Sequence, residues 1–293
     1  MTPTQRRFTW QEMKKYWQIH STRWSSIDYH RDPDGLGNVC YPGAPLWLNQ
    51  HYARFQKLVY QKIFMLIPPP IAGARALDVG CGAGRWCRFL NERGYDTTGI
   101  DLQPELIEIN RHRYPDIRFF NTPIQDYVAE EPFDLISAVT VIQHIPFDEQ
   151  DVVFQKLRGF LRVNGYAIML ESIHYQTPHV FSNTIQEWQA RVESAGFRCM
   201  AIQRYDYSPF LRLHSWIVQR LMLMLRRSHL NDTVLTPETI VASSIGGHRN
   251  FFSSLDSAAT RLSLGLDTML ESILIYSNVA LPARHCGFLF KAI

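Results

Sequence analysis

The chain has 293 residues, of which 46% are hydrophobic and 13% aromatic, and this content is sufficient for a packed core. The formal net charge of +3, from 30 Lys and Arg against 27 Asp and Glu, is too small to indicate a dedicated nucleic-acid surface. Five scattered cysteines without paired C-x-x-C spacing argue against a zinc site and a secreted disulfide scaffold, so a reducing, cytoplasmic location is expected.

The first 70 residues are expected to form a cover and a helix. Residues 1–48 are rich in Trp and Tyr and contain a turn-dense stretch, RDPDGLGNVCYPGAP, in which Gly and Pro exclude regular structure. From Asn49 onward, apolar residues recur at helical spacing until Pro68, where three consecutive prolines end the helix. The aromatic residues Trp17, Trp24, Tyr41 and Trp47 are candidates to cover a ligand site.

Residues 71–207 alternate between strand and helix patterns. Strands are predicted at residues 74–80, 96–101, 117–122, 133–141, 165–172 and 197–205, and helices at about 83–93, 103–113, 149–161 and 184–196. This alternation predicts parallel strands with helices on both faces, and a last strand is predicted at 285–293. The expected fold is therefore a doubly wound, Rossmann-like α/β domain with a seven-stranded sheet.

A helical insertion is expected at residues 208–283, ahead of the last core segment at 284–293. The stretch Pro209–Arg227 is rich in Leu and Met and carries four arginines, but its apolar run is too short to span a bilayer. A lid or homodimer-interface helix is the favoured interpretation. Contact with a membrane surface or a lipid-linked substrate is the alternative.

The stretch LDVGCGAGRW places three glycines directly after the first predicted strand. Glycines let the chain turn tightly and bring backbone N–H groups against a ligand, and the following helix N-terminus favours an anion. Nineteen residues after Gly82, Asp101 ends the second strand, where a carboxylate can accept hydrogen bonds from ribose hydroxyls. These features predict a nucleotide-like ligand, and a nicotinamide-dependent oxidoreductase would show similar features.

Asp78 ahead of the glycines and the stretch GYDTTGIDLQPELI behind them resemble the class I S-adenosylmethionine-dependent methyltransferases of the small-molecule branch. The resemblance covers about residues 74–207 and the last strand. It implies S-adenosylmethionine as cofactor, with the methionine part at the glycine loop, the ribose at the acidic residue and the adenine beside the next residue. The implied contacts are Asp78, Gly80, Gly82, Asp101 and Leu102.

Two further stretches extend the resemblance. After the third strand, NTPIQDY offers Ile124, Gln125 and Asp126 as adenine contacts. After the fourth strand, the resemblance places the backbone of Val139 and Thr140 toward the sulfonium and His144 at the acceptor entrance. The spacing of the glycines and the preceding Asp weigh against the oxidoreductase.

Methyl transfer to a hydroxyl oxygen needs alignment of the two reactants and a general base. His144 is the first candidate, because imidazole titrates near neutrality. Glu171 and His174 lie at the end of the fifth strand, at the edge where ligands bind. No His and Asp cluster has the spacing of metal ligands, so no metal is expected.

The acceptor is expected to be a small molecule such as a sugar, a glycan precursor or a secondary metabolite, methylated at oxygen. The N-P-P-Y type motif of DNA amino-methyltransferases and the paired glutamates of protein arginine methyltransferases do not occur after the fourth strand, which reads TVIQHIP. Methylation at carbon or nitrogen, and a catalytically silent cofactor-binding assembly protein, are the alternatives.

Overall fold

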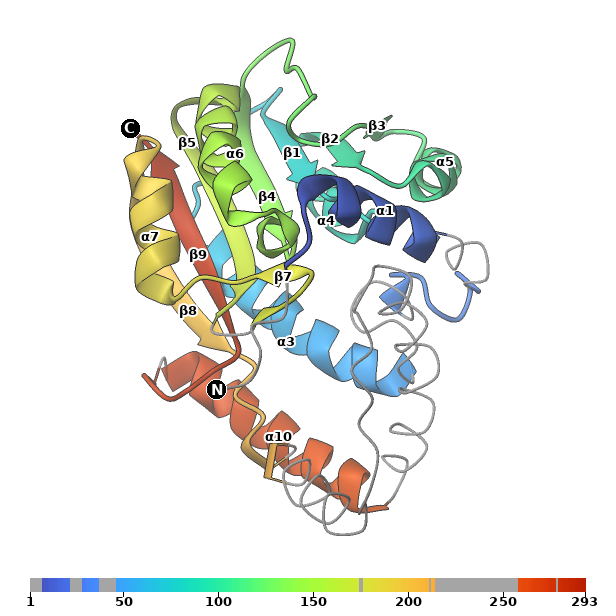
Figure 1. Ribbon diagram of the computed structural model, residues 1–293, viewed down its shortest axis with the longest axis vertical. Helices are drawn as coiled ribbons and strands as arrows, with labels where there is room; N and C mark the ends of the chain where they lie inside the picture. The colour runs from blue at the N-terminus through green and yellow to red at the C-terminus, as the bar shows by residue number, and fades with distance from the viewer. Residues whose placement is uncertain are drawn as a thin grey trace.

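The computed structural model describes residues 7–21, 28–36, 46–173, 176–210, 212–213, 258–277 and 279–293. Within these residues, seven strands form one sheet in the order β3-β2-β1-β4-β5-β9-β8 (Figure 1). The strands are β1 (Arg75–Val79), β2 (Asp96–Asp101), β3 (Arg118–Asn121), β4 (Phe133–Val139), β5 (Leu161–Ser172), β8 (Phe197–Tyr205) and β9 (His285–Ala292). The predicted seven-stranded α/β fold is confirmed.

The strand directions place one set of loops at a single edge of the sheet. β1 is parallel to β2 and β4, β3 is parallel to β2, and β5 is parallel to β4. β9 is antiparallel to both β5 and β8, so β8 runs in the same direction as the other strands. The ends of β1, β2, β4, β5 and β8 and the start of β9 therefore lie at one edge, which we call the carboxyl edge.

Helices cover both faces of the sheet. The buried side chains of α6 (Phe147–Phe160) and α7 (Ile185–Ser194) pack on one face, and those of α3 (Leu46–Phe64) and α10 (Ala258–Ser277) on the other, together with α4 (Arg85–Asn91). Figure 1 shows α6 and α7 in front of the sheet and α3 crossing behind it. α5 (Pro104–Arg113) packs beside β2 and β3.

Local sequence explains where several of these elements begin and end. All five residues of β1 are buried because the strand lies between the two helix layers. α3 ends at Phe64, one turn before the three prolines that the sequence predicts as its end. α7 begins with a capping box, in which Thr184 Oγ1 accepts a hydrogen bond from Glu187 N at 3.2 Å and Glu187 Oε2 accepts one from Thr184 N at 2.7 Å.

Two small elements complete the carboxyl edge. α1 (Trp10–Ser21) packs through Met13 and Tyr16 against Phe181, which belongs to a hairpin of β6 (Gln176–Thr177) and β7 (Val180–Phe181). The 3₁₀ helix η2 (Ile142–His144) follows β4. These elements bring the aromatic N-terminal segment over the loops that follow β4 and β5.

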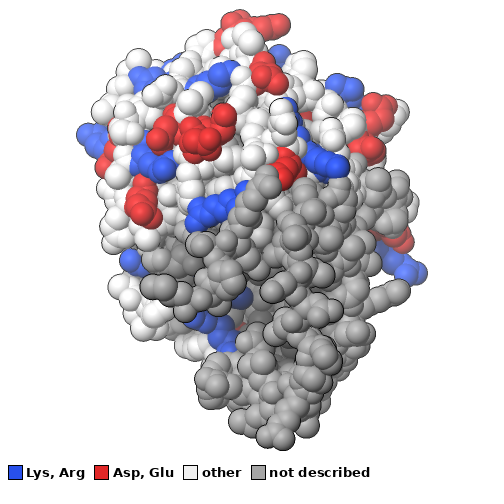
Figure 2. Space-filling model, viewed as in Figure 1, with Lys and Arg blue, Asp and Glu red and all other residues white. Residues whose placement is uncertain are grey.

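The predicted insertion is described only in part. α10 occupies its end, whereas residues 214–257 lie outside the described residues, and the division of the chain at residues 70, 207 and 283 stays a prediction. No helix in the described ranges is long and apolar enough to cross a membrane. On the face of the molecule drawn in Figure 2, Lys and Arg alternate with Asp and Glu over the described surface, in keeping with the small net charge.

Candidate active site

The glycine loop at residues 80–84 connects β1 to α4 at the carboxyl edge. Gly80, Gly82 and Gly84 have φ angles of +64°, +53° and +75°, a left-handed conformation that side chains disfavour. A Cβ atom added at Gly80 would lie 2.9 Å from Val141 Cγ1 and closer still to Cγ2. The loop after β1 therefore lies directly against the loop after β4, and a side chain at position 80 would separate them.

The carboxylate of Asp101 joins the end of β2 to this loop. Asp101 Oδ2 accepts a hydrogen bond from Gly82 N at 2.9 Å, and Oδ1 accepts one from Gln103 N at 3.0 Å. Burial raises the pKa of Asp101, although these N–H donors oppose the shift. From α5, Asn110 Nδ2 donates to Gly82 O at 2.7 Å. Asn110 was not identified from the sequence, because a single amide among the apolar residues of a predicted helix forms no recognisable motif.

Asp78 lies beneath the loop, inside the sheet layer. It is 1% exposed, and Cys87 Sγ lies 3.4 Å from its Oδ2. Burial raises the pKa of Asp78 to about 7, opposed by hydrogen bonds from Ser137 and Cys87. Its carboxylate therefore contacts α4, the helix that follows the glycine loop.

The loop after β4 contains a strained residue. Thr140 has a φ of +56°, which is unusual for a β-branched residue and costs on the order of 1–3 kcal/mol. Its N–H donates to Leu170 O at 2.7 Å, and its Oγ1 donates to Val139 O at 2.7 Å. Strain of this kind concentrates at functional sites. Val139 and Thr140 were predicted from the sequence to face a ligand. They directly precede Val141, which lies against Gly80 of the glycine loop.

Glu171, at the end of β5, holds this loop in place. Its buried carboxylate accepts hydrogen bonds from the backbone N–H groups of Val141 (3.2 Å), Ile142 (2.9 Å) and Gln143 (3.1 Å). Burial raises the pKa of Glu171 to about 8, opposed by these three bonds. A catalytic role for Glu171 stays a prediction, and its contacts favour a positioning role.

A chain of hydrogen bonds fixes the tautomer and the orientation of the His144 ring. Ser172 N donates to Gln143 Oε1 at 2.6 Å, which turns the Gln143 amide nitrogen toward His144 Nε2 at 3.2 Å. His144 Nδ1 lies 2.9 Å from the carbonyl oxygen of His179, so Nδ1 carries the hydrogen and Nε2 accepts. Burial lowers the pKa of His144 to about 4, so the ring is neutral at neutral pH.

Aromatic side chains from α1 cover His144. The ring centroid of Trp17 lies 4.9 Å from that of His144, and Tyr16 stacks on His179 at 4.7 Å. Trp17 thus packs on His144, and its role in covering a ligand stays a prediction. Trp24, Tyr41 and the candidate base His174 lie outside the described residues.

The predicted adenine contacts follow β2 and β3. Ile124 is buried, Asp126 is exposed and Leu102 is partly buried. Both polar atoms of the Gln125 side chain are buried and have no hydrogen-bond partner among the described residues. A buried amide without partners is costly, and a ligand that both donates and accepts would satisfy it.

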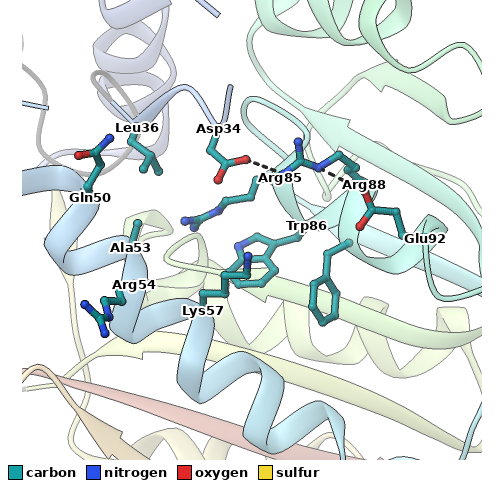
Figure 3. A pocket seen from close by; sticks show the side chains of 11 residues that line it. Asp34, Leu36, Gln50, Ala53, Arg54, Lys57, Arg85, Trp86, Arg88 and Glu92 are labelled. Carbon is teal, nitrogen blue, oxygen red and sulfur yellow. Dashed lines mark hydrogen bonds and ion pairs between the residues drawn. The ribbon is translucent and has the colours of Figure 1, made fainter. Parts of the chain in front are cut away.

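A cavity of about 280 Å³ lies between α3 and α4, next to the glycine loop (Figure 3). Arg88 at its wall pairs with Asp34 at 2.9 Å and with Glu92 at 3.8 Å. In the described part of the chain, the other basic groups at the wall, Arg54, Lys57 and Arg85, form no ion pair with a carboxylate. The remaining lining residues are Leu36, Gln50, Ala53, Trp86 and Phe89. The cavity is therefore basic, a property that the sequence did not reveal.

Comparisons with known proteins identify the domain that carries this site. A family model described as a methyltransferase domain matches residues 76–165, from β1 into β5. The ubiquinone biosynthesis O-methyltransferase of Xylella fastidiosa (strain 9a5c) is 40% identical over 83 residues, which are 26% of this chain and 34% of that protein. The protein of the same name from Xanthomonas euvesicatoria pv. vesicatoria (strain 85-10) is 29% identical over 158 residues, 50% of this chain and 62% of that protein.

The chain thus spans between a third and two thirds of the length of these curated relatives. Among solved structures, a putative sarcosine dimethylglycine methyltransferase from Galdieria sulphuraria is similar with a TM-score of 0.52 at 13% identity, covering 82% of this chain and 85% of that one. The [4+2]-cyclase SpnF is similar with a TM-score of 0.50 at 14% identity, covering 82% and 80%. These likenesses concern the fold. Residues 76–165, which contain the glycine loop, Asp101 and Thr140, belong to the class I S-adenosylmethionine-dependent methyltransferase domain family.

Proposed function

We propose that this protein transfers a methyl group from S-adenosylmethionine to a hydroxyl oxygen of a small molecule. The observation that carries the proposal is the 2.9 Å hydrogen bond between Gly82 N and Asp101 Oδ2, which joins the left-handed glycine loop to the carboxylate at the end of β2. The name of the curated relatives, ubiquinone biosynthesis O-methyltransferase, supports oxygen as the acceptor atom.

The side chains at the carboxyl edge fit this cofactor chemically. Each oxygen of Asp101 accepts one N–H bond, and a carboxylate has about four acceptor positions, so capacity remains for the ribose hydroxyls. The buried Gln125 amide, which has no partner among the described residues, can both donate to and accept from the edge of an adenine. Gly80, Gly82, Val139 and Thr140 would surround the amino-acid end and the sulfonium, and Asp78 would support the loop from below.

The bound cofactor would supply a methyl group attached to a positively charged sulfur. The protein's own contribution is alignment and exclusion of water, because the charge disappears as the methyl group leaves. Glu171 holds the loop after β4 through three N–H bonds, and Trp17 covers the adjacent His144. His144 is neutral and its Nε2 accepts from the Gln143 amide, so its proposed role is to line the acceptor entrance and not to take the proton.

The basic cavity beside α4 supports a ligand with a negatively charged group. Arg85 follows Gly84 directly, so the cavity adjoins the position proposed for the cofactor. Arg54 and Lys57 line it from α3. A carboxylate or phosphate on the acceptor, or the carboxylate of the cofactor, would find its counter-charge here.

The predicted partners other than the small-molecule acceptor stay predictions. α10 exposes a row of apolar side chains at helical spacing, including Leu262, Leu266, Met269, Ile273 and Tyr276. This row supports the proposal that the unit at residues 208–283 docks on another surface, which would be a second copy, a membrane surface or a lipid-linked substrate. The cytoplasmic location also stays a prediction.

The proposal is tested by mass spectrometry on the purified full chain with S-adenosylmethionine and a panel of phenols, catechols, sugars and hydroxy acids. We expect one methylated product bearing an O-methyl group, formed in equal amount with S-adenosylhomocysteine. Because a fold does not fix a reaction, and a protein with this fold is a [4+2]-cyclase, product identity is the decisive readout. Cofactor binding without S-adenosylhomocysteine formation from any panel member would support the catalytically silent alternative instead.

A further inference from the structure

A second group of charged side chains lies at the carboxyl edge, where β8 ends and β9 begins. His285, the first residue of β9, is paired in register with Ser172 at the end of β5 and with Tyr205 at the end of β8. β5 in turn pairs with β4, which leads into Thr140 and His144. His285 therefore lies two strands away from the proposed position of the sulfonium, on the same edge of the sheet.

His285 forms a close pair with a buried carboxylate. Its Nδ1 lies 2.9 Å from Asp206 Oδ2, and Arg284 Nη2 lies 2.7 Å from Asp206 Oδ1. Asp206 is 3% exposed. Burial raises the pKa of Asp206, but the charges and hydrogen bonds of Arg284 and His285 outweigh it and hold the pKa well below its usual value. Because an ionised carboxylate only accepts, Nδ1 carries the hydrogen and Nε2 is the basic atom of the neutral ring.

The Nε2 atom of His285 makes no hydrogen bond to any part of the chain that the structure describes. The His285 side chain is 21% exposed, and its ring stacks on Tyr205 with centroids 5.3 Å apart. In His144, by contrast, Gln143 already occupies Nε2 and burial lowers the pKa to about 4. His285 is thus oriented by two neighbours and has its basic atom available.

The backbone around Asp206 is strained and held by another buried acid. Asp206 and Ser208 have φ angles of +61° and +37°. Glu271 of α10 accepts hydrogen bonds from the N–H groups of Asp206, Tyr207 and Ser208, the last at 3.1 Å. Side chains held by strained backbone are a recurrent feature of active sites. Glu271 therefore fixes the backbone at Asp206, while Ser208 Oγ, Arg284 and His285 hold its carboxylate.

We propose that Asp206 and His285 are the general base of the methyl transfer. This inference rests on the proposed function. His285 Nε2 takes the proton as the acceptor O–H bond breaks, and the freed electron pair on oxygen forms the new bond to the methyl carbon. The carbon–sulfur bond breaks with its electron pair remaining on sulfur. Asp206 stabilises the imidazolium that results and keeps the ring in the reactive tautomer.

Other charged groups around the pair bear on its pH response. Arg284, directly before β9, also donates to Tyr52 Oη of α3 at 3.1 Å. His51 of α3 lies near Asp206 and Arg284, and burial lowers its pKa to about 4, so it is neutral at neutral pH. For Glu271 of α10, burial raises the pKa to about 7. Because Glu271 is ionisable and bonds to the backbone of Asp206, the ring of His285 must be observed directly.

The first test is NMR of the full chain labelled with ¹⁵N-histidine and saturated with S-adenosylhomocysteine, between pH 6 and pH 9. His285→Gln assigns the signal. We expect the neutral His285 ring to carry its hydrogen on Nδ1, with Nε2 unprotonated. A neutral ring with its hydrogen on Nε2, or a ring still protonated on both nitrogens at pH 9, would overturn the proposal.

The second test is kinetic, with whichever panel compound the wild-type protein methylates. His285→Gln keeps an amide that can donate to Asp206, and we expect kcat to fall by about 100-fold or more while the affinity for S-adenosylhomocysteine and Tm stay close to wild type. The control is His112→Gln, an exposed histidine of α5 paired with Glu108, which should leave kcat unchanged. An unchanged kcat in His285→Gln, or a comparable fall in His112→Gln, contradicts the assignment.

The two tests separate the base from the proposed function. If the wild-type protein methylates nothing in the panel, the proposed function fails, and the NMR result still decides whether the ring has the tautomer that the pair requires. Asp206→Asn provides a further check, because the amide can no longer stabilise an imidazolium. We expect a lower kcat and a changed pH profile of kcat in this variant. A change confined to Tm would assign Asp206 a structural role and overturn the proposal.

Discussion

Replacing Gly80 by alanine is expected to reduce the affinity for S-adenosylhomocysteine on the order of 100-fold or more. The new Cβ would lie within 2.9 Å of Val141 Cγ1 and closer to Cγ2, so rotation of the valine cannot relieve the overlap. Val141 cannot move away freely, because its N–H is bonded to Glu171 Oε1 at 3.2 Å. The loops after β1 and β4 would have to separate. Isothermal titration calorimetry measures the affinity, and thermal unfolding should show a loss of about 2–4 kcal/mol.

Gly73→Ala is the matched control for this substitution. Gly73 also has a left-handed backbone, with φ of +78°, but an added Cβ there would meet no heavy atom within 4 Å. It carries the conformational penalty of about 1 kcal/mol without the steric overlap. We expect the affinity of Gly73→Ala for S-adenosylhomocysteine to equal that of wild type. If the two substitutions reduce the affinity equally, contact between the loops after β1 and β4 is not required for cofactor binding.

Replacing Asp101 by alanine is expected to weaken cofactor binding by about 1–3 kcal/mol, or roughly 10- to 150-fold. The substitution removes the acceptor for Gly82 N and Gln103 N, together with the proposed partner of the ribose hydroxyls. Asp101→Asn retains one oxygen acceptor and should fall between alanine and wild type. Titration of each variant with S-adenosylhomocysteine gives the dissociation constants.

Asp96→Ala is the control within the same strand. Asp96 is at the opposite end of β2, where its half-exposed carboxylate pairs with Arg118 at 2.6 Å. An exposed pair contributes little to stability, and the position is remote from the carboxyl edge. Its dissociation constant should match wild type. An Asp101→Ala variant that also matches wild type would remove Asp101 from the cofactor site.

Local pattern was sufficient to predict the order of the core elements. The alternation of short apolar runs with helical periodicity gives β1 to β5 and the helices between them, because each run is buried between two layers. The direction of β9 could not be read in the same way. Its pairing with β5 and β8 depends on residues far apart in the sequence. The β6–β7 hairpin was also missed, since two-residue strands carry no periodicity.

The parts of the candidate site that lie at a fixed spacing along the sequence were predictable. The glycines and Asp101 end adjacent parallel strands, which brings Gly82 and Asp101 within hydrogen-bond distance. Glu171 and His144 were identified as polar groups at the correct edge, but their partners, three N–H groups and the Gln143 amide, depend on how the loop after β4 folds. Asp206 and His285 are 79 residues apart, so no local pattern connects them.

Isothermal titration calorimetry of the wild-type protein tests the central claim most directly. The glycine loop and the Asp101 carboxylate are held together as one site for the amino-acid and sugar parts of a sulfonium nucleoside. We expect S-adenosylmethionine and S-adenosylhomocysteine to bind with one-to-one stoichiometry and NAD⁺ to give no heat of binding. Binding of NAD⁺ without binding of either S-adenosyl compound would contradict the account.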